Sequence, residues 1–518
     1  MAGFRNRSFA LAIGALAVVA AGARGQGSIQ LKTFRMEAPQ LAGDDLSKML
    51  DLRTGKLRTT GPSLKANQDL FRKVSRNIIF KATYEQYYEV PETGELKPRP
   101  NDSNFDSLLS DFSQLILTPT PGMVPPYTID QAEYIKELGK ALDATFREVW
   151  AKNPPTVIRV NTGRMFALAT KSGAPEFSKT IVELVTNQFF KAKDSKSAET
   201  PPELLLYALK AAEGLLGASD PYLVNRPDPN KHTVPEEGLV VLVKALEDVI
   251  EKGPQVADKA AVLNPELPGK PPAIEDDTAP KPKDPKGPKT PAPGANKLES
   301  TGQSPEQIAL VRYFRRQAIR ALAKVRYDSI GGENAIPRVR PAFVLAKIAV
   351  ADTSISPLPS ATEIAEAVIG LCGVNPTRDL KVEELATSIA KGIELLVRFN
   401  SEDRARARDN LNNTAENKVL LAVPWKLYTA RLEAAFAGMK RGTATVPRLK
   451  ASSPMILALV DAVSVDVLAP LGKDDGGGLA QPSLDRLSRW LEQYNKDGAR
   501  SLYEDDPKYK LKPAQFTN

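Results

Sequence analysis

The sequence predicts an all-α protein: two helical lobes, each a bundle or a short α-solenoid, separated by a disordered linker rich in proline and lysine. Three observations lead to this prediction. Apolar residues recur at helical spacing along most of residues 63–263 and 304–500, and no segment alternates apolar and polar residues over a convincing length. Between these regions the composition changes abruptly. A chain of 518 residues is also too long for a single hydrophobic core.

Residues 1–25 have the parts of a secretory signal peptide. Arg5 and Arg7 are followed by an apolar run, residues 9–21, and then by small residues typical of a cleavage site. The run is shorter than the roughly 20 residues needed to cross a bilayer. We therefore expect cleavage near Ala23–Gly25 and an extracytoplasmic protein, secreted or in a bacterial periplasm. No transmembrane segment is expected in the mature chain.

The contents of cysteine, histidine and charge limit the possible chemistry. Cys372 is the only cysteine and His232 the only histidine, so neither an internal disulfide nor an ordinary zinc site can form. Serine or cysteine nucleophile chemistry would have to involve His232, which lies in a polar loop. We assign no catalytic, cofactor-binding or metal-binding residue and expect no cofactor. The formal net charge of +8 permits an anionic partner without requiring one.

The mature chain begins with residues 26–62, which show no convincing period and are predicted to be an irregular arm. The N-terminal helical domain is predicted to span residues 63–263. Thr128 and Gln131 form a capping box for one of its helices. The best strand candidate, residues 156–160, is too short to matter. A Pro-Glu pair, a frequent helix opening, recurs at four places and is expected to begin helices of about 15 to 20 residues: Pro175, Pro202, Pro235 and Pro305.

Residues 264–303 are predicted to form the linker. Ten of the thirty residues from Pro265 to Gly294 are proline and five are lysine. Such a segment cannot bury enough apolar surface to offset its chain entropy, so we expect a solvated, semi-extended tether.

The clearest helix is Ser304–Arg326, at the start of the second domain. Ser304 is placed to cap it, and one face carries apolar residues that predict contact with a core: Val311, Phe314, Ala318, Leu322 and Val325. Further helices are expected at residues 341–351, 360–372, 381–399, 403–438, 454–469 and 483–495. The polar tail, residues 501–518, is expected to fray.

Two stretches of this domain, mainly within residues 305–350, resemble one another. Arg316–Val325 and Val339–Ile348 both end in Leu-Ala-Lys followed by a β-branched residue. This pattern of small and apolar positions resembles a helix of a HEAT-type repeat. The resemblance implies a stacked helical solenoid that binds a protein or a polymer on its surface, with no catalytic residue to carry over.

The opposite face of the Ser304–Arg326 helix is basic and is the candidate site for a polyanion. Its residues are Arg312, Arg316, Arg320 and Lys324, and Arg315 and Arg326 flank it. The alternative interpretation is that this is simply the solvent face of an amphipathic helix, with its charges neutralised by Asp and Glu of a neighbouring helix.

The sequence therefore favours a secreted or periplasmic, non-catalytic structural or interaction protein. The first alternative is a binder of anionic polymer (envelope glycan, lipid headgroups or nucleic acid) through the basic helix face. The second is a hydrolase with an unidentified carboxylate pair. As partner we expect a protein or an envelope polymer rather than nucleic acid.

Overall fold

The computed structural model describes most of the chain from residue 34 onward. The described residues are 34–59, 64–84, 87, 105–117, 127–191, 199–218, 233–254, 305–332, 336–409, 415–472, 481–494, 501–504 and 507–514. The predicted signal peptide, the predicted linker and His232 lie outside these ranges. Within them the fold is all-α, as the sequence predicts, and β-pairing is limited to isolated bridges.

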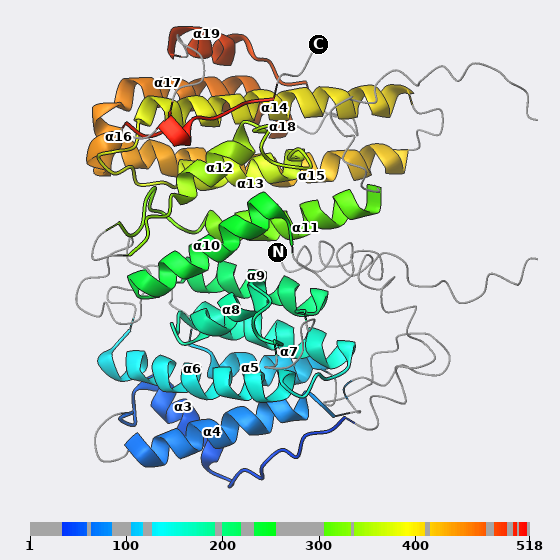
Figure 1. Cartoon of the computed structure of the whole chain (residues 1–518), viewed down its shortest axis with the longest axis vertical. Helices are drawn as coiled ribbons and strands as arrows, with labels where there is room; N and C mark the ends of the chain where they lie inside the picture. The colour runs from blue at the N-terminus through cyan, green and yellow to red at the C-terminus, as the bar shows by residue number, and fades with distance from the viewer. Residues whose placement is uncertain are drawn as a thin grey trace, which may run out of the picture.

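The first half of the chain contains eight of the labelled α-helices (Figure 1). They are α3 (Asp45–Thr54), α4 (Leu64–Lys81), α5 (Phe105–Leu115), α6 (Ile129–Trp150), α7 (Thr156–Ala169), α8 (Phe177–Val185), α9 (Pro202–Gly217) and α10 (Glu236–Lys252).

The second half begins after residue 304. Its helices are α11 (Pro305–Leu322), α12 (Pro341–Ala349), α13 (Ala361–Cys372), α14 (Val382–Asp409), α15 (Ala415–Thr445), α16 (Pro447–Ala451), α17 (Ser453–Val463), α18 (Ala469–Gly472) and α19 (Asp485–Tyr494).

The helices are stacked along the long axis of the molecule (Figure 1). From α6 to α15 they form two layers, because each helix packs against the next helix but one, and most helices also pack against the next one. Helices α7, α9, α11, α13 and α15 form one layer, and α6, α8, α10, α12 and α14 form the other. Each helix thus depends on its neighbours in the stack to bury its apolar face, as in other stacked helical proteins.

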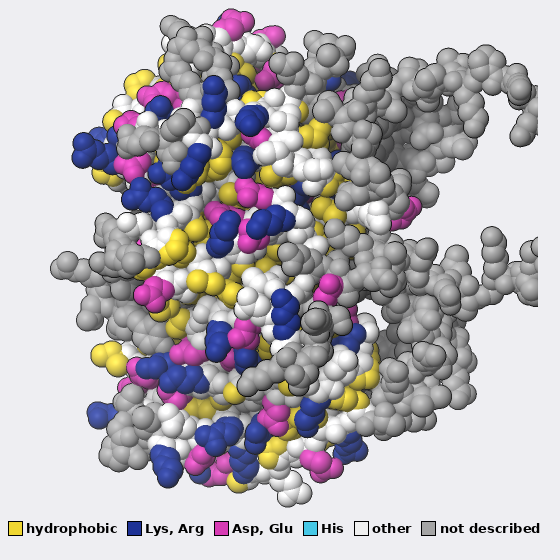
Figure 2. All heavy atoms as spheres, viewed as in Figure 1, with side chains coloured by type: hydrophobic (Ala, Val, Ile, Leu, Met, Phe, Trp, Pro, Cys, Tyr) yellow, Lys and Arg dark blue, Asp and Glu magenta, His cyan; other side chains and the backbone are white. Residues whose placement is uncertain are grey.

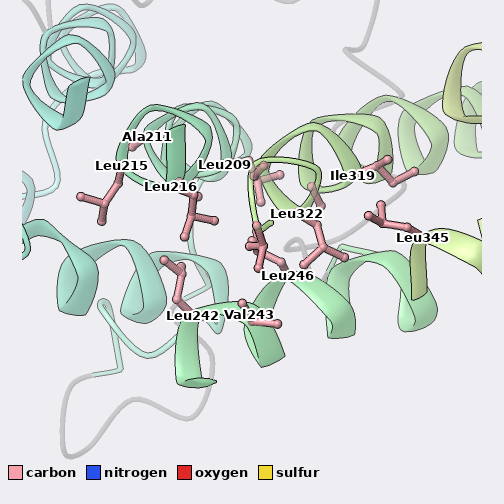
Figure 3. Close-up of a cluster of buried hydrophobic side chains, with 14 of the residues drawn as sticks. Leu209, Ala211, Leu215, Leu216, Leu242, Val243, Leu246, Ile319, Leu322 and Leu345 are labelled. Atoms are coloured by element: carbon pink, nitrogen blue, oxygen red, sulfur yellow. The ribbon is translucent and has the colours of Figure 1, made fainter. Parts of the chain in front are cut away.

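The two halves of the chain contact each other directly. Helix α11 packs against both α9 and α10, and one hydrophobic core extends through all three. Figure 3 shows this contact, with Leu209 of α9, Leu246 of α10 and Leu322 of α11 close together and Leu345 of α12 beyond them. The lobes that the sequence predicts are therefore successive parts of one stack.

Several local predictions are confirmed. The Thr128–Gln131 capping box is present, with both of its hydrogen bonds. Helices begin at or within two residues of the four Pro-Glu pairs, although α8 has only nine residues. In addition to these predicted features, Gly253 ends α10 with a φ of 79°, a backbone conformation that favours glycine. The five apolar residues of the predicted core face of α11 and its end, Val311 to Val325, are all buried.

Three helices were missed by the sequence analysis, and one of them is the short α16, which lies between the predicted helices 403–438 and 454–469. The predicted irregular arm contains α3, where Met49 and Leu52 are buried while Leu46 and Leu50 are exposed, so the apolar period is blurred. The strand candidate at residues 156–160 is the start of α7. Its β-branched residues disfavour a helix only weakly, and packing against α9 overrides that preference.

The predictions for the C-terminal region need two corrections. Helix α14 does not end at residue 399 but continues to Asp409. The tail does not fray over residues 501–504 and 507–514. Leu502 and Tyr503 are fully buried, and the Tyr503 hydroxyl donates to the Asp328 carbonyl oxygen at 2.7 Å. The tail is polar in overall composition, and this composition did not reveal that two of its aromatic side chains, those of Tyr503 and Tyr509, hold it in place.

One described stretch, Ser453–Gly472, is long and apolar enough to cross a membrane by length and composition alone. In this structure 56% of its most apolar window is buried. Ile456, Leu459 and Val463 are fully buried, and α17 packs against α15 and α19. The stretch therefore has the surroundings of a core helix, and the absence of a membrane span from the mature chain stays a prediction.

We expect the two halves to remain associated after the chain between them is cut. A protease recognition sequence inserted between Gly287 and Pro288 should allow cleavage, and both fragments should still elute together from a size-exclusion column. The physical reason is the apolar contact of α11 with α9 and α10. In the control, Ile319→Asp and Leu322→Asp in α11 should separate the fragments. Separation without these substitutions would contradict the continuous core.

Candidate functional site

The six predicted polyanion-binding residues do not form one surface. Arg315 is fully buried, and its guanidinium donates to both carboxylate oxygens of Glu363, at 2.5 and 3.2 Å, and to the Pro357 carbonyl oxygen at 2.7 Å. Arg312 donates to the Leu358 carbonyl oxygen. These two arginines therefore hold the segment before α13 against α11, and Arg315 is inaccessible to a polymer.

Glu363 anchors this arrangement from the other side. It also accepts hydrogen bonds from the main-chain nitrogen and the hydroxyl of Ser360, at 2.8 and 2.7 Å, as the third residue of a capping box. One fully buried carboxylate thus joins the start of α13 to Arg315 of α11. A buried charge of this kind is tolerated only because it is paired and hydrogen-bonded.

The other four predicted residues lie further along α11 and beyond its end. Lys324 and Arg326 are exposed after the last helical turn, whereas Arg316 and Arg320 are half-buried. The Arg316 guanidinium lies 5.7 Å from the centre of the Tyr313 ring. Arg320 pairs with carboxylates of the two neighbouring helices in its layer. The alternative interpretation, in which carboxylates of neighbouring helices neutralise the basic face, therefore describes Arg315 and Arg320. It does not describe Arg316.

Arg320 belongs to a row of ion pairs across four helices of one layer. It lies 3.1 Å from Glu213 of α9 and 3.9 Å from Glu366 of α13. Glu366 in turn accepts hydrogen bonds from both terminal nitrogens of Arg431 on α15. The row Glu213–Arg320–Glu366–Arg431 therefore alternates in sign from helix to helix. It tends to fix the stacking register, because a shift of one helix would separate opposite charges.

Three helices of the same layer carry Tyr-x-x-Lys/Arg: Tyr207–Lys210, Tyr313–Arg316 and Tyr428–Arg431. Residues three apart lie on one helix face, and the Lys210 ammonium is 5.1 Å from the centre of the Tyr207 ring. We call this surface the Tyr/Arg band. It consists of Tyr207, Lys210, Glu213, Tyr313, Arg316, Arg320, Glu366, Tyr428 and Arg431. The recurring motif was the available sequence signal for it, and the sequence analysis missed it.

The electrostatics of the band keep it positive and rich in hydrogen-bond donors. It contains four cations and two carboxylates. Burial raises the pKa of the Tyr207, Tyr313 and Tyr428 hydroxyls, so these groups stay protonated and able to donate at neutral pH. Burial, and then the Arg320 charge, lower the pKa of Lys210.

Charges elsewhere on the described surface are mixed. Figure 2 shows Lys and Arg side chains beside Asp and Glu side chains, with hydrophobic side chains between them. Within the part of the chain that the structure describes, no group of three or more His, Cys, Asp or Glu is arranged to hold a metal ion. Cys372, which is buried, has its thiol pKa raised to about 12 by that burial.

Carboxyl groups with raised pKa values occur between helices, outside the band. Burial raises the pKa of Asp143 on α6 to about 6 and that of Glu247 on α10 to about 7, and it also raises the pKa of Glu176 before α8. Glu247 is 7% exposed, and Lys244 on the same helix lies 3.7 Å from it. Each of these groups lies at a helix packing contact, and no sequence pattern had marked it.

Comparison with known proteins gives no relative for this chain. No family model, no curated protein and no solved structure matches it. The resemblance to HEAT-type repeats therefore stays a prediction.

Replacing Arg315 by Met should destabilise the protein by about 3–5 kcal/mol, because Glu363 would remain buried without a counter-charge. Urea denaturation measures the change in the free energy of unfolding. In the control, Arg72→Met removes an exposed pair with Asp69, at 62% and 63% exposure, and should cost about 1 kcal/mol or less. Adding Glu363→Gln to Arg315→Met should recover part of the lost stability. Equal losses of stability in Arg315→Met and Arg72→Met would contradict a buried Arg315–Glu363 ion pair.

Replacing Glu247 by Gln should stabilise the protein at pH 8 but not at pH 4. The pKa is raised in the folded state, so from about pH 4.5 to about 7 the folded protein keeps a proton that the unfolded chain has released. Wild-type stability therefore falls as the pH rises through this window. The gain should approach about 3 kcal/mol above pH 7, because each pKa unit is worth about 1.4 kcal/mol.

Denaturation curves across this pH range test the effect of Glu247→Gln. The exposed Glu237→Gln, on the same helix, controls for the loss of one surface charge. If Glu247→Gln raises the free energy of unfolding equally at every pH, desolvation of the charged carboxylate is not the cause of the gain.

Proposed function

We propose that this protein is an extracytoplasmic, non-catalytic scaffold that binds its partner along the side of its helical stack. The observation that carries the proposal is the Tyr/Arg band. It places matching Tyr-x-x-Lys/Arg pairs from three helices of one layer, α9, α11 and α15, on a single surface, as a protein that binds an extended partner requires.

Three further features support this function. The apolar core is continuous from the first half of the chain to the second, so the band is held on a rigid body. The ion pairs of the band join four helices and fix their spacing. Residues 1–25 have the pattern of an export signal. The proposal that the protein acts outside the cytoplasm rests on this pattern.

The hydrolase alternative would need two carboxyl groups that face a common substrate. The most perturbed carboxyl groups, those of Asp143 and Glu247, belong to different helix contacts, α6 with α8 and α10 with the segment before α12. Their raised pKa values follow from burial between helices, and we propose a structural role for them.

Binding and turnover measurements with the mature chain, residues 26–518, test the scaffold function. The protein should bind saturably to immobilised envelope material from a Gram-negative bacterium, separated into protein, glycan and lipid fractions. It should bind at least one fraction more strongly than cytosolic extract. Mass spectrometry after prolonged incubation should find the bound fraction chemically unchanged. Cleavage products would favour the hydrolase, and equal retention of cytosolic extract would contradict a specific scaffold.

A further inference from the structure

We propose that the Tyr/Arg band binds an acidic polysaccharide, a linear chain whose carboxylate groups lie against Lys210 and Arg316. This inference rests on the proposed scaffold function and names the class of partner. It moves the anion site from the face of one helix, α11, to a surface that crosses α9, α11, α13 and α15.

Lys210 and Arg316 are the two cations of the band that make no ion pair with a described residue, although the Glu213 carboxylate attracts the Lys210 ammonium from one turn further along α9. Among the residues that the structure describes, neither has a carboxylate within ion-pair distance, and the neighbour of each is the tyrosine one turn earlier. Arg320 and Arg431 are committed to Glu213 and Glu366. A ligand carboxylate would therefore be attracted to Lys210 and Arg316 without having to break the ion-pair row.

Each of these cations lies near a tyrosine ring that carries a neutral donor, its hydroxyl. Tyr134 and Tyr503, in the core, donate to main-chain carbonyl oxygens. In the described part of the chain, the Tyr207 and Tyr313 hydroxyls have no such acceptor. A tyrosine hydroxyl next to a cation offers a carboxylate one neutral and one charge-assisted hydrogen bond.

The covered aromatic faces of the band favour a polysaccharide over a nucleic acid. Glu213 is 21% exposed and can accept hydrogen bonds from sugar hydroxyls. Binding of single-stranded nucleic acid needs exposed aromatic faces on which bases stack. Here Lys210 lies over the Tyr207 ring and Arg316 lies near the Tyr313 ring, and Tyr207 is only 9% exposed.

The spacing of the band requires an extended ligand. Packed helices are separated by about 8–10 Å, so the pairs Tyr207–Lys210 and Tyr313–Arg316 repeat at roughly that interval across α9 and α11. A linear polysaccharide with acidic units at regular intervals can reach both pairs at once. Simultaneous contacts of this kind raise the affinity well above that of a single site.

Polygalacturonate, a linear polyuronate, is the probe for this site, with neutral dextran, dextran sulfate, duplex DNA and anionic phospholipid vesicles for comparison. The mature protein should bind polygalacturonate more tightly than the other four at physiological salt, as measured by biolayer interferometry. Lys210→Glu with Arg316→Glu should weaken this binding about tenfold, because two attractive contacts become repulsive. Tyr313→Phe should weaken it about threefold, the effect of losing one hydrogen bond.

Lys440→Glu with Lys450→Glu is the matched control. Both lysines are exposed, on α15 and α16, and the change in net charge is the same. The control should keep its affinity for polygalacturonate within about twofold of the wild-type value. All variants should have the melting temperature of the wild type. Equal losses of affinity in the two double variants would show that net charge alone causes the effect, and this result would overturn the proposal.

Tighter binding of dextran sulfate, DNA or vesicles than of polygalacturonate would also overturn it. If no probe binds but a protein fraction of the envelope does, the assignment of the partner fails while the scaffold function stands.

Discussion

The structure depends first on the apolar contact between α11 and the pair α9 and α10. This contact joins two halves that are separated in sequence by residues 255–304, which lie outside the described ranges. Leu209, Leu246 and Leu322 are fully buried there. Because the contact is apolar and closely packed, it continues the stack instead of leaving the halves as separate domains. The surface that crosses α9 and α11 exists only because of this contact.

Charged residues act on this framework in two ways. The Arg315–Glu363 pair is fully buried, and it links α11 to the start of α13 through several directed hydrogen bonds. The half-exposed row from Glu213 to Arg431 contributes less free energy per pair, since water screens it, but its alternating signs suit only one stacking register. Apolar packing by itself has little directional preference, and these ion pairs determine which helices pack together and in which register.

The sequence analysis succeeded where local signals and burial agreed, and failed where tertiary contacts opposed them. The capping box at Thr128 and the apolar face of α11 were correct because each depends on neighbours within a few residues. Helix α7 was missed because its β-branched start is a weak helix former, and its packing against α9 was not visible. Gly163 of α7 shows how close that contact is: a Cβ atom there would lie 2.6 Å from the Tyr207 ring.

By itself, the sequence determined the all-α class, the position of most helices and the absence of an ordinary zinc or disulfide site, because these follow from residue periodicity and composition. It also contained the Tyr-x-x-Lys/Arg motif, but with no indication that the copies at Tyr207, Tyr313 and Tyr428 belong together. Only the tertiary structure decided which helices are neighbours. It therefore also decided that Arg315 is buried and that Arg316 makes no ion pair with any residue that the structure describes. The physical reason is that a side chain's charge is encoded locally, whereas its burial and its partners depend on helices far away in the chain.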